Sequence, residues 1–339
     1  MRRLRLSTAV LPALVATSLL LAGCGGDSEE ESSGDSPAAQ EIAGGSTLDS
    51  TWPLTGLEVT GDESAAQTHP VLVTKMDNTG SSAPQIGLGS ADMVVEELVE
   101  GGLTRLAAFF YSELPEEVGP VRSMRASDIG IVSPVGASIV TSGAAGKTIA
   151  RLKGAGITFY AEGSKGIYRD NGRSAPYNLF ANLGDVATAA EQDEERPDDY
   201  FQWGDGKDLP KGQKATAISA TFGGARTSEW AFRDGHYVNT NSYSAEGDGF
   251  LADTVLVLRV QVGDAGYLDP AGNPVPETKL EGKGEAMLFH DGSLVRGTWS
   301  KDGLDDSIEL RTKAGTLEVP AGHTFVELIP AANGSVTFK

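Results

Sequence analysis

The spacing of apolar residues changes along the chain and predicts two structural regions. Between residues 70 and 190, short apolar segments alternate with segments rich in glycine and charge. Strands that alternate with short helices are typical of an α/β or α+β fold. The pattern predicts strands at 70–76, 91–99, 103–111 and 157–160, and a short helix at 147–153 that stops at Gly154.

From residue 215 onward the pattern becomes that of β-structure. Two pairs, Asp234-Gly235 and Asp291-Gly292, lie between apolar runs and favour hairpin turns. Further strands are predicted at 253–262 and 324–329. We therefore expect an α+β protein, with a mixed α/β N-terminal domain followed by a β-rich C-terminal domain, either a barrel or a sandwich.

The N-terminus has the order of a secretory signal peptide. Arginines at positions 2, 3 and 5 precede an uncharged apolar run over 9–22, which is shorter than the roughly 20 residues of a membrane-spanning helix. The run ends in Leu-Ala-Gly-Cys24, which resembles the bacterial lipobox. That resemblance implies a diacylglycerol on Cys24 and an exported protein, anchored to the outer face of the bacterial cytoplasmic membrane.

Composition sets the domain boundaries and excludes some partners. We expect the following parts: signal peptide 1–23, lipidated Cys24 and acidic Ser/Gly-rich tether 24–51, α/β domain 52–195, linker 196–214 and β-rich domain 215–335. The formal net charge of −20 argues against nucleic-acid binding. Since Cys24 is the only cysteine, thiol catalysis and cysteine-zinc sites are excluded, and the four histidines have no metal-ligand spacing. No metal or cofactor is expected.

A set of arginines among glycines and prolines carries the strongest chemical signal. Arginine presents a planar, permanently charged fork that suits carboxylate and phosphate groups. The candidate ligand-binding residues are Arg105, Arg122, Arg125, Arg173 and Asn178, and the candidate acid/base residues are Asp77, Glu96 and Glu100. The same arginines could instead pair with neighbouring acids in a structural network. The segment 143–148 lacks the first glycine of a phosphate loop.

Six segments together resemble the YerB-like bacterial lipoprotein family, whose members carry a domain of unknown function in two parts. The matching segments, in order, are Met76-Asp77-Asn78, 84–88, 91–96, 100–105, Gly119-Pro-Val-Arg122-Ser-x-Arg125 and Arg173-x-Ala-Pro-x-Asn178-Leu. The resemblance covers about residues 52–330. It implies a two-domain fold and an envelope location, but supplies no activity. The family shows His where this chain has Tyr177, so no role for an imidazole is expected there.

Three functional hypotheses follow. The favoured one is a non-catalytic envelope lipoprotein whose N-terminal domain binds an anionic cell-wall ligand or an envelope protein. The second is a cell-wall hydrolase or transferase that uses a carboxylate with arginines as substrate clamps. The third is a scaffold for another envelope protein.

Overall fold

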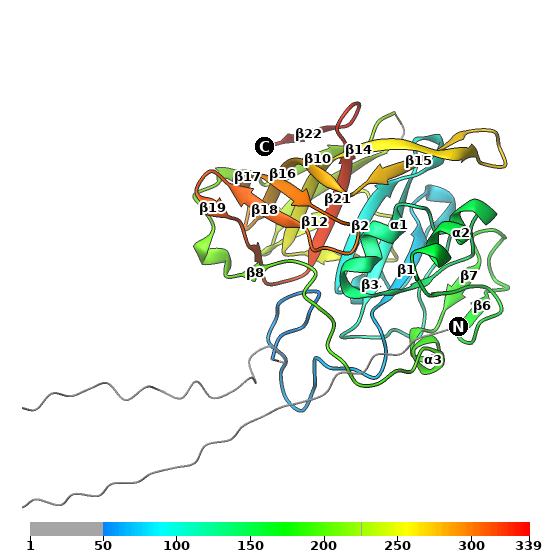
Figure 1. The fold of residues 1–339 in the computed structure, drawn as a ribbon. Coiled ribbons are helices and arrows are strands. Elements are labelled where there is room, and N and C mark those ends of the chain that lie inside the picture. The colour runs from blue at the N-terminus through cyan, green and yellow to red at the C-terminus, as the bar shows by residue number, and fades with distance from the viewer. Residues whose placement is uncertain (1–49, 225) are drawn as a thin grey trace, which may run out of the picture. The chain divides into compact units, whose positions relative to one another are not determined.

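Within residues 50–224 and 226–339, which the computed structural model describes, one mixed sheet of thirteen strands runs through both halves of the chain (Figure 1). Cys24 and the predicted signal peptide lie outside these residues, as does the tether up to residue 49. The strand order is β19-β18-β17-β16-β14-β21-β2-β3-β1-β4-β5, with β15 beside β14 and β9 beside β17. The strands are β1 Leu72–Asp77, β2 Met93–Leu98, β3 Thr104–Phe110, β4 Ser138–Val140, β5 Phe159–Tyr160, β9 Gln213–Lys214, β14 Thr254–Leu268, β15 Pro274–Lys279, β16 Gly282–His290, β17 Ser293–Lys301, β18 Glu309–Thr312, β19 Gly315–Thr316 and β21 Thr324–Pro330.

A second, five-stranded sheet packs against one face of this central sheet. Its order is β13-β12-β11-β10-β22. Its strands are β10 Ala217–Thr221, β11 Thr227–Arg233, β12 His236–Asn239, β13 Leu251–Ala252 and β22 Ser335–Phe338. Trp230 of β11 and Phe325 of β21 meet edge to face, with ring centroids 4.6 Å apart, and both belong to the apolar core between the sheets.

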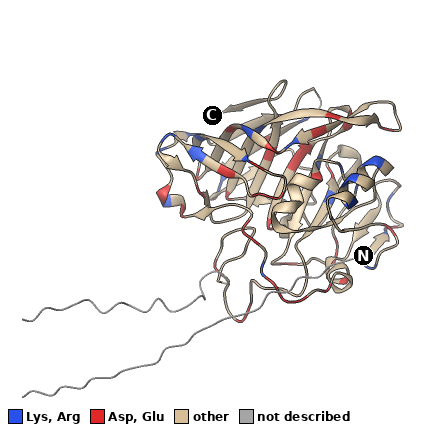
Figure 2. Cartoon of the chain, viewed as in Figure 1, with Lys and Arg blue, Asp and Glu red and all other residues tan. Residues whose placement is uncertain are grey.

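The remaining elements are short. The α-helices are α1 Asp128–Val132, α2 Gly146–Gly154 and α3 Leu183–Ala189, and the 3-10 turns are η1 Gly80–Ser82, η2 Leu88–Ser90, η3 Glu100–Gly102, η4 Ser133–Val135 and η5 Gly206–Asp208. Two small ribbons pair β6 Ile167–Arg169 with β7 Leu179–Ala181, and β8 Trp203–Gly204 with β20 Val319–Pro320. Basic side chains gather on α2 (Figure 2). No helix of the described part is long and apolar enough to cross a bilayer.

A second apolar core covers the other face of the central sheet. Val73, Val95 and Val326 point from β1, β2 and β21 towards Ile131 of α1 and Leu152 of α2. Because side chains alternate along a strand, the next residues point into the first core. The strands are buried on both faces, and this explains why their sequences are apolar at nearly every position.

The predicted α+β class is confirmed, and so are most predicted elements. The strands predicted at 91–99 and 103–111 are β2 and β3, the predicted helix is α2, and both Asp-Gly pairs lie at hairpin turns. The predicted domain boundaries remain a prediction. In space the two regions share the central sheet, because β21 pairs in parallel with both β2 and β14.

Candidate functional site

The segment that carries Arg122 and Arg125 crosses the carboxyl ends of the parallel strands β1 and β4. The backbone N–H of Arg122 donates to Lys75 O at 2.7 Å, and Ser142 N–H donates to Arg122 O at 3.1 Å. The carboxyl edge of parallel strands is the usual place for ligands in open α/β sheets. The same edge holds residues 143–148, which follow β4 and begin α2; Ala145, which precedes α2, provides no side-chain cap.

Three of the five predicted ligand-binding residues converge at this edge, together with two of the predicted acid/base residues. We call Arg105, Arg122, Arg125, Asp77 and Glu100 the edge cluster. Arg122 Nε lies 2.9 Å from Asp77 Oδ2. Arg125 donates to Glu100 through Nε at 3.1 Å and through Nη2 at 2.5 Å, which is the bidentate geometry of a strong pair.

Arg105 lies at the centre of the edge cluster. Its Nη1 donates to the carbonyl of Ser123 at 2.7 Å, and its Nε is buried with no hydrogen-bond partner in the described part. Burial, and next the positive charge of Arg125, lower the pKa of Arg105 to about 10, and Arg122 acts in the same direction. Arg105 therefore stays charged at neutral pH, and the carboxylates of Glu100 and Asp77 only partly offset the effects of burial and of the two neighbouring arginines.

Arg122 is the member of the edge cluster that presents its fork outward. Its side chain is 22% exposed, compared with 9% for Arg125. Among the described residues, no hydrogen-bond acceptor contacts its Nη1 or Nη2. Its guanidinium lies 5.5 Å from the ring centroid of Tyr177, a stacking contact that holds the plane of the fork. The arrangement can receive a planar or tetrahedral oxyanion.

A buried triad anchors the cluster from beneath. Lys75 Nζ lies 2.7 Å from both Glu97 Oε1 and Asp128 Oδ1, and all three side chains are fully buried. Asp128 Oδ2 also accepts a hydrogen bond from the backbone N–H of Arg125 at 2.6 Å. Burial raises the pKa of Asp128 to about 6, against the opposing effect of Lys75.

The other two predicted ligand-binding residues lie outside the edge cluster and contact other parts of the chain. Arg173 donates to Ser82 O and Pro84 O and stacks on Phe180. Asn178 accepts a hydrogen bond from Arg169 Nη1 at 2.6 Å. The structure therefore brings Tyr177, which lies between them in sequence, to the edge cluster. Arg173 is bound instead to the segment around Ser82 and Pro84, and Asn178 to Arg169 of its own hairpin.

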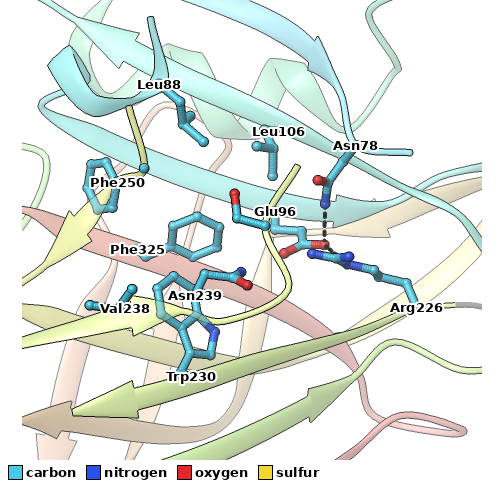
Figure 3. Close-up of a pocket in the computed structure, with 12 residues that line it drawn as sticks. Asn78, Leu88, Glu96, Leu106, Arg226, Trp230, Val238, Asn239, Phe250 and Phe325 are labelled. Atoms are coloured by element: carbon cyan, nitrogen blue, oxygen red, sulfur yellow. Dashed lines mark hydrogen bonds and ion pairs between the residues drawn. The ribbon is translucent and has the colours of Figure 1, made fainter. Parts of the chain in front are cut away.

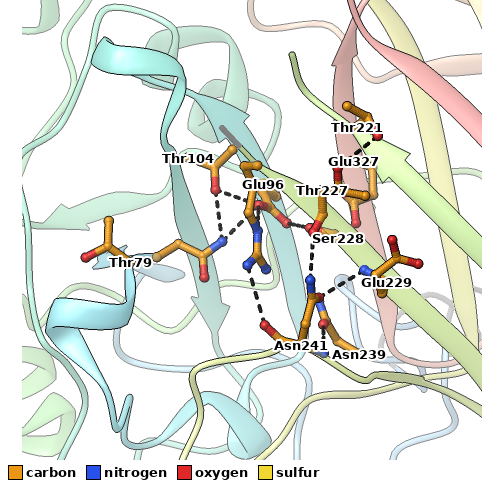
Figure 4. Close-up of polar contacts among 12 residues, drawn as sticks. Thr79, Glu96, Thr104, Thr221, Thr227, Ser228, Glu229, Asn239, Asn241 and Glu327 are labelled. Carbon is orange, nitrogen blue, oxygen red and sulfur yellow. Dashed lines mark hydrogen bonds and ion pairs between the residues drawn. The ribbon is translucent and has the colours of Figure 1, made fainter. Parts of the chain in front are cut away.

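Glu96, the third predicted acid/base residue, lies on the opposite face of the central sheet. It is fully buried and accepts four hydrogen bonds; Figure 4 shows Glu96 with two of the donors, Thr104 and Ser228. The donors are Asn78 Nδ2 at 2.8 Å, Thr104 Oγ1 at 2.6 Å, Ser228 Oγ at 2.7 Å and Arg226 Nε at 3.3 Å.

A second glutamate lies beside Glu96 on the neighbouring strand. Glu327 of β21 pairs in register with Glu96 of β2 and is also fully buried. Its Oε1 accepts from Trp230 Nε1 at 2.8 Å, while its Oε2 has no partner in the described part. Burial, and next the charge of Glu96, raise the pKa of Glu327 well above its ordinary range. One guanidinium thus faces two carboxyl groups, and the raised pKa favours the protonated form of Glu327.

A small cavity adjoins Glu96 between the two sheets (Figure 3). Its volume is about 30 Å³, enough for one or two water molecules. Glu96, Asn78 and Arg226 form its polar wall, and Phe250 and Phe325 belong to its apolar wall. The cavity is too small to hold a polymer or peptide.

Reasoning from the sequence missed Arg226 and Glu327. Each lies more than a hundred positions from Glu96 and reaches it only through the packing of the two sheets. One weak signal existed for Glu327: a lone acid in the apolar strand 324–329 is a candidate buried charge. Tyr177 lay inside a quoted motif, but its contact with Arg122 depends on the fold.

The comparisons with known proteins agree with this architecture. Residues 54–196 match the N-terminal domain of the family described as protein of unknown function (DUF3048), and residues 218–326 match its C-terminal domain. "Putative lipoprotein YerB" of Bacillus subtilis (strain 168) is 25% identical over 295 residues, which is 82% of this chain and 86% of that protein. The crystal structure of YerB protein from Bacillus subtilis shares the fold, with a TM-score of 0.69 and 19% identity over 85% of this chain and 99% of the other. The chain is a YerB-like member of the two-domain DUF3048 family.

Proposed function

We propose that this chain is an exported lipoprotein that binds an anionic group of the cell envelope at the edge cluster. A lipid on Cys24 would hold it at the outer face of the cytoplasmic membrane. The lipobox-like sequence before Cys24 supports the anchor, as does the similarity to a relative named as a lipoprotein. The anchor keeps the edge cluster within reach of envelope polymers.

One observation carries the binding proposal. Arg122 presents two guanidinium nitrogens that contact no acceptor of the described residues, next to the buried and partnerless Nε of Arg105. Buried polar groups in folded proteins are nearly always hydrogen-bonded, so a partnerless one suggests a missing partner. An oxyanion is the partner that two adjacent guanidinium groups bind best.

The surroundings of the acids favour binding over hydrolysis. Glu96 is fully buried, and the side chains of Asp77 and Glu100 are only 6% and 11% exposed. Each of the three is already engaged by at least one arginine. A general acid or base must reach the proton that it transfers. In this account the carboxylates hold the arginines in place, and the arginines hold the ligand.

Arg122→Ala tests the proposal against purified wall polymer that carries carboxylate or phosphate groups. We expect binding in a sedimentation assay to be lost, with unfolding free energy changed by less than about 1 kcal/mol, because Arg122 is partly exposed. Arg311→Ala is the matched control, since Arg311 forms an exposed pair with Glu309 on β18. Equal polymer binding by wild type and Arg122→Ala would contradict the proposal. Crosslinking of Arg122-dependent protein partners, with no polymer binding, would favour the scaffold instead.

Cys24→Ser tests the anchor separately. Serine cannot form the thioether, so the protein should move from the membrane fraction to the soluble fraction after cell lysis. A variant that still sediments with membranes would refute the lipid anchor, while leaving the edge cluster untouched.

A further inference from the structure

We propose that the group bound at the edge cluster carries a single negative charge, as a carboxylate or a phosphodiester does, and that the cluster discriminates against a dianion such as a phosphate monoester. This inference rests on the proposed function and specifies the charge of its ligand.

The charge balance of the edge cluster favours a monoanion. Three guanidinium groups, those of Arg105, Arg122 and Arg125, face two carboxylates, those of Asp77 and Glu100. Within the edge cluster the excess is one positive charge, and the buried triad of Lys75, Glu97 and Asp128 beneath it supplies no further positive charge. A monoanion is therefore the most that the site can neutralise. A dianion would leave an excess negative charge in a site whose members are mostly buried, where uncompensated charge is costly.

Both carboxylates of the edge cluster are fixed in place. Asp77 Oδ1 accepts hydrogen bonds from Thr79 N–H at 3.0 Å and Thr79 Oγ1 at 2.5 Å, while its Oδ2 faces Arg122. Glu100 is held by the two hydrogen bonds from Arg125. Neither carboxylate can move away from the ligand without losing these hydrogen bonds. The second negative charge of a dianion is therefore repelled by two carboxylates that are held in place.

Several hydrogen-bond donors remain for the ligand. Arg122 Nη1 and Nη2 form a fork for two oxygens. The hydroxyls of Ser123 and Ser142 lie 3.3 Å apart beside the same segment and are half-buried. They are neutral donors that can serve further oxygens without adding positive charge. The site therefore supplies several hydrogen bonds but only one uncompensated charge.

Methyl phosphate and dimethyl phosphate form a matched pair of probes. They differ by one methyl group, but at about pH 8 the monoester carries close to two charges and the diester only one, since the second pKa of a phosphate monoester is about 6. Acetate is the carboxylate arm. Dissociation constants are measured with the full chain from the shifts of the arginine Nε–Hε NMR signals.

We expect dimethyl phosphate to bind about tenfold more tightly than methyl phosphate at about pH 8. The ratio should approach one at about pH 5, where both probes are monoanions. Asp77→Asn should raise the affinity for methyl phosphate at about pH 8, whereas Glu309→Gln, which removes an exposed acid on β18, should not. Acetate binding at least as tight as that of dimethyl phosphate would identify carboxylate as the preferred source of the monoanion.

Two results would overturn the inference in different ways. Tighter binding of methyl phosphate than of dimethyl phosphate by the wild type at about pH 8 would refute the preference for a single charge and leave the anion site intact. No Arg122-dependent shift with any of the three probes would refute the anion site itself, and with it the proposed function.

Discussion

Glu327→Gln tests whether the carboxyl group of Glu327 is protonated in the folded protein. Burial, and next the charge of Glu96, raise the pKa of Glu327 well above its ordinary value of 4.5. At pH values between 4.5 and the raised pKa, Glu327 binds fewer protons in the unfolded chain than in the folded chain. The free energy of unfolding therefore falls as pH rises. The contribution of protonated Glu327 to stability is complete below pH 4.5 and is lost progressively as pH rises through the folded-state pKa.

The size of the effect follows from proton linkage. Each pH unit in this window costs the wild type about 1.4 kcal/mol of unfolding free energy. Glutamine keeps the shape of the side chain and does not ionise. As long as Glu327 stays protonated in the folded chain, the variant should therefore gain about 2–3 kcal/mol on the wild type between about pH 5 and about pH 7.

Denaturant unfolding at several pH values measures the difference between the two proteins. Asp128 also titrates in this range, because burial raises its pKa to about 6, but it contributes equally to both proteins and cancels. Glu96→Gln is the control, since it makes the same chemical change on the neighbouring strand. It removes the carboxylate that Arg226 contacts and should destabilise the protein by about 3–5 kcal/mol. Because the charge of Glu96 helps to raise the pKa of Glu327, this variant should also show a weaker dependence of stability on pH.

A constant difference between wild type and Glu327→Gln from about pH 5 to about pH 7 would refute the reasoning. It would mean that Glu327 has the same protonation state in the folded and unfolded chains. The pair of glutamates would then be two charges that share Arg226, and the network around Glu96 would need another explanation.

Three further substitutions probe the framework of the site. Glu100→Ala should destabilise by about 3 kcal/mol in denaturant unfolding, because it leaves Arg125 nearly buried without its partner; a change within 0.5 kcal/mol would count against the pair as a structural element. Gly119 lies in the segment that leads to Arg122, and a Cβ at this position would lie 2.9 Å from Leu179 O. Gly119→Ala should therefore lower the free energy of unfolding by about 1–3 kcal/mol and weaken ligand binding. Unchanged stability and binding would show that the segment can shift freely. Trp230→Phe should cost about 1–3 kcal/mol by removing the donor to Glu327 Oε1, and near-neutral unfolding data would show that the bond is dispensable.

Local patterns in the sequence predicted much of the fold. Strands β2 and β3 and helix α2 follow from apolar runs and from a stop at Gly154. The shared central sheet could not be predicted in this way, because β2 and β21 are separated by more than two hundred positions and nothing in either strand specifies the other. Strand pairing at such a distance is decided by packing rather than by local preference.

The residues of the candidate site could be predicted from the sequence, but their roles could not. Arg105, Arg122 and Arg125 stood out because glycine and proline surround them, and the fold brings all three together. Their separate roles were not predictable. The pairing of Arg125 with Glu100, which leaves Arg122 as the outward fork, depends on where η3 places Glu100.

The binding of a monoanion to Arg122 is the central claim, and NMR titration with dimethyl phosphate tests it most directly. The account predicts saturable shifts of the Arg122 and Arg105 Nε–Hε signals in the wild type, and loss of the Arg105 shift in a stably folded Arg122→Ala variant. Saturable binding of the same affinity in Arg122→Ala would contradict the account, because the ligand would then be held without the fork on which the site is built.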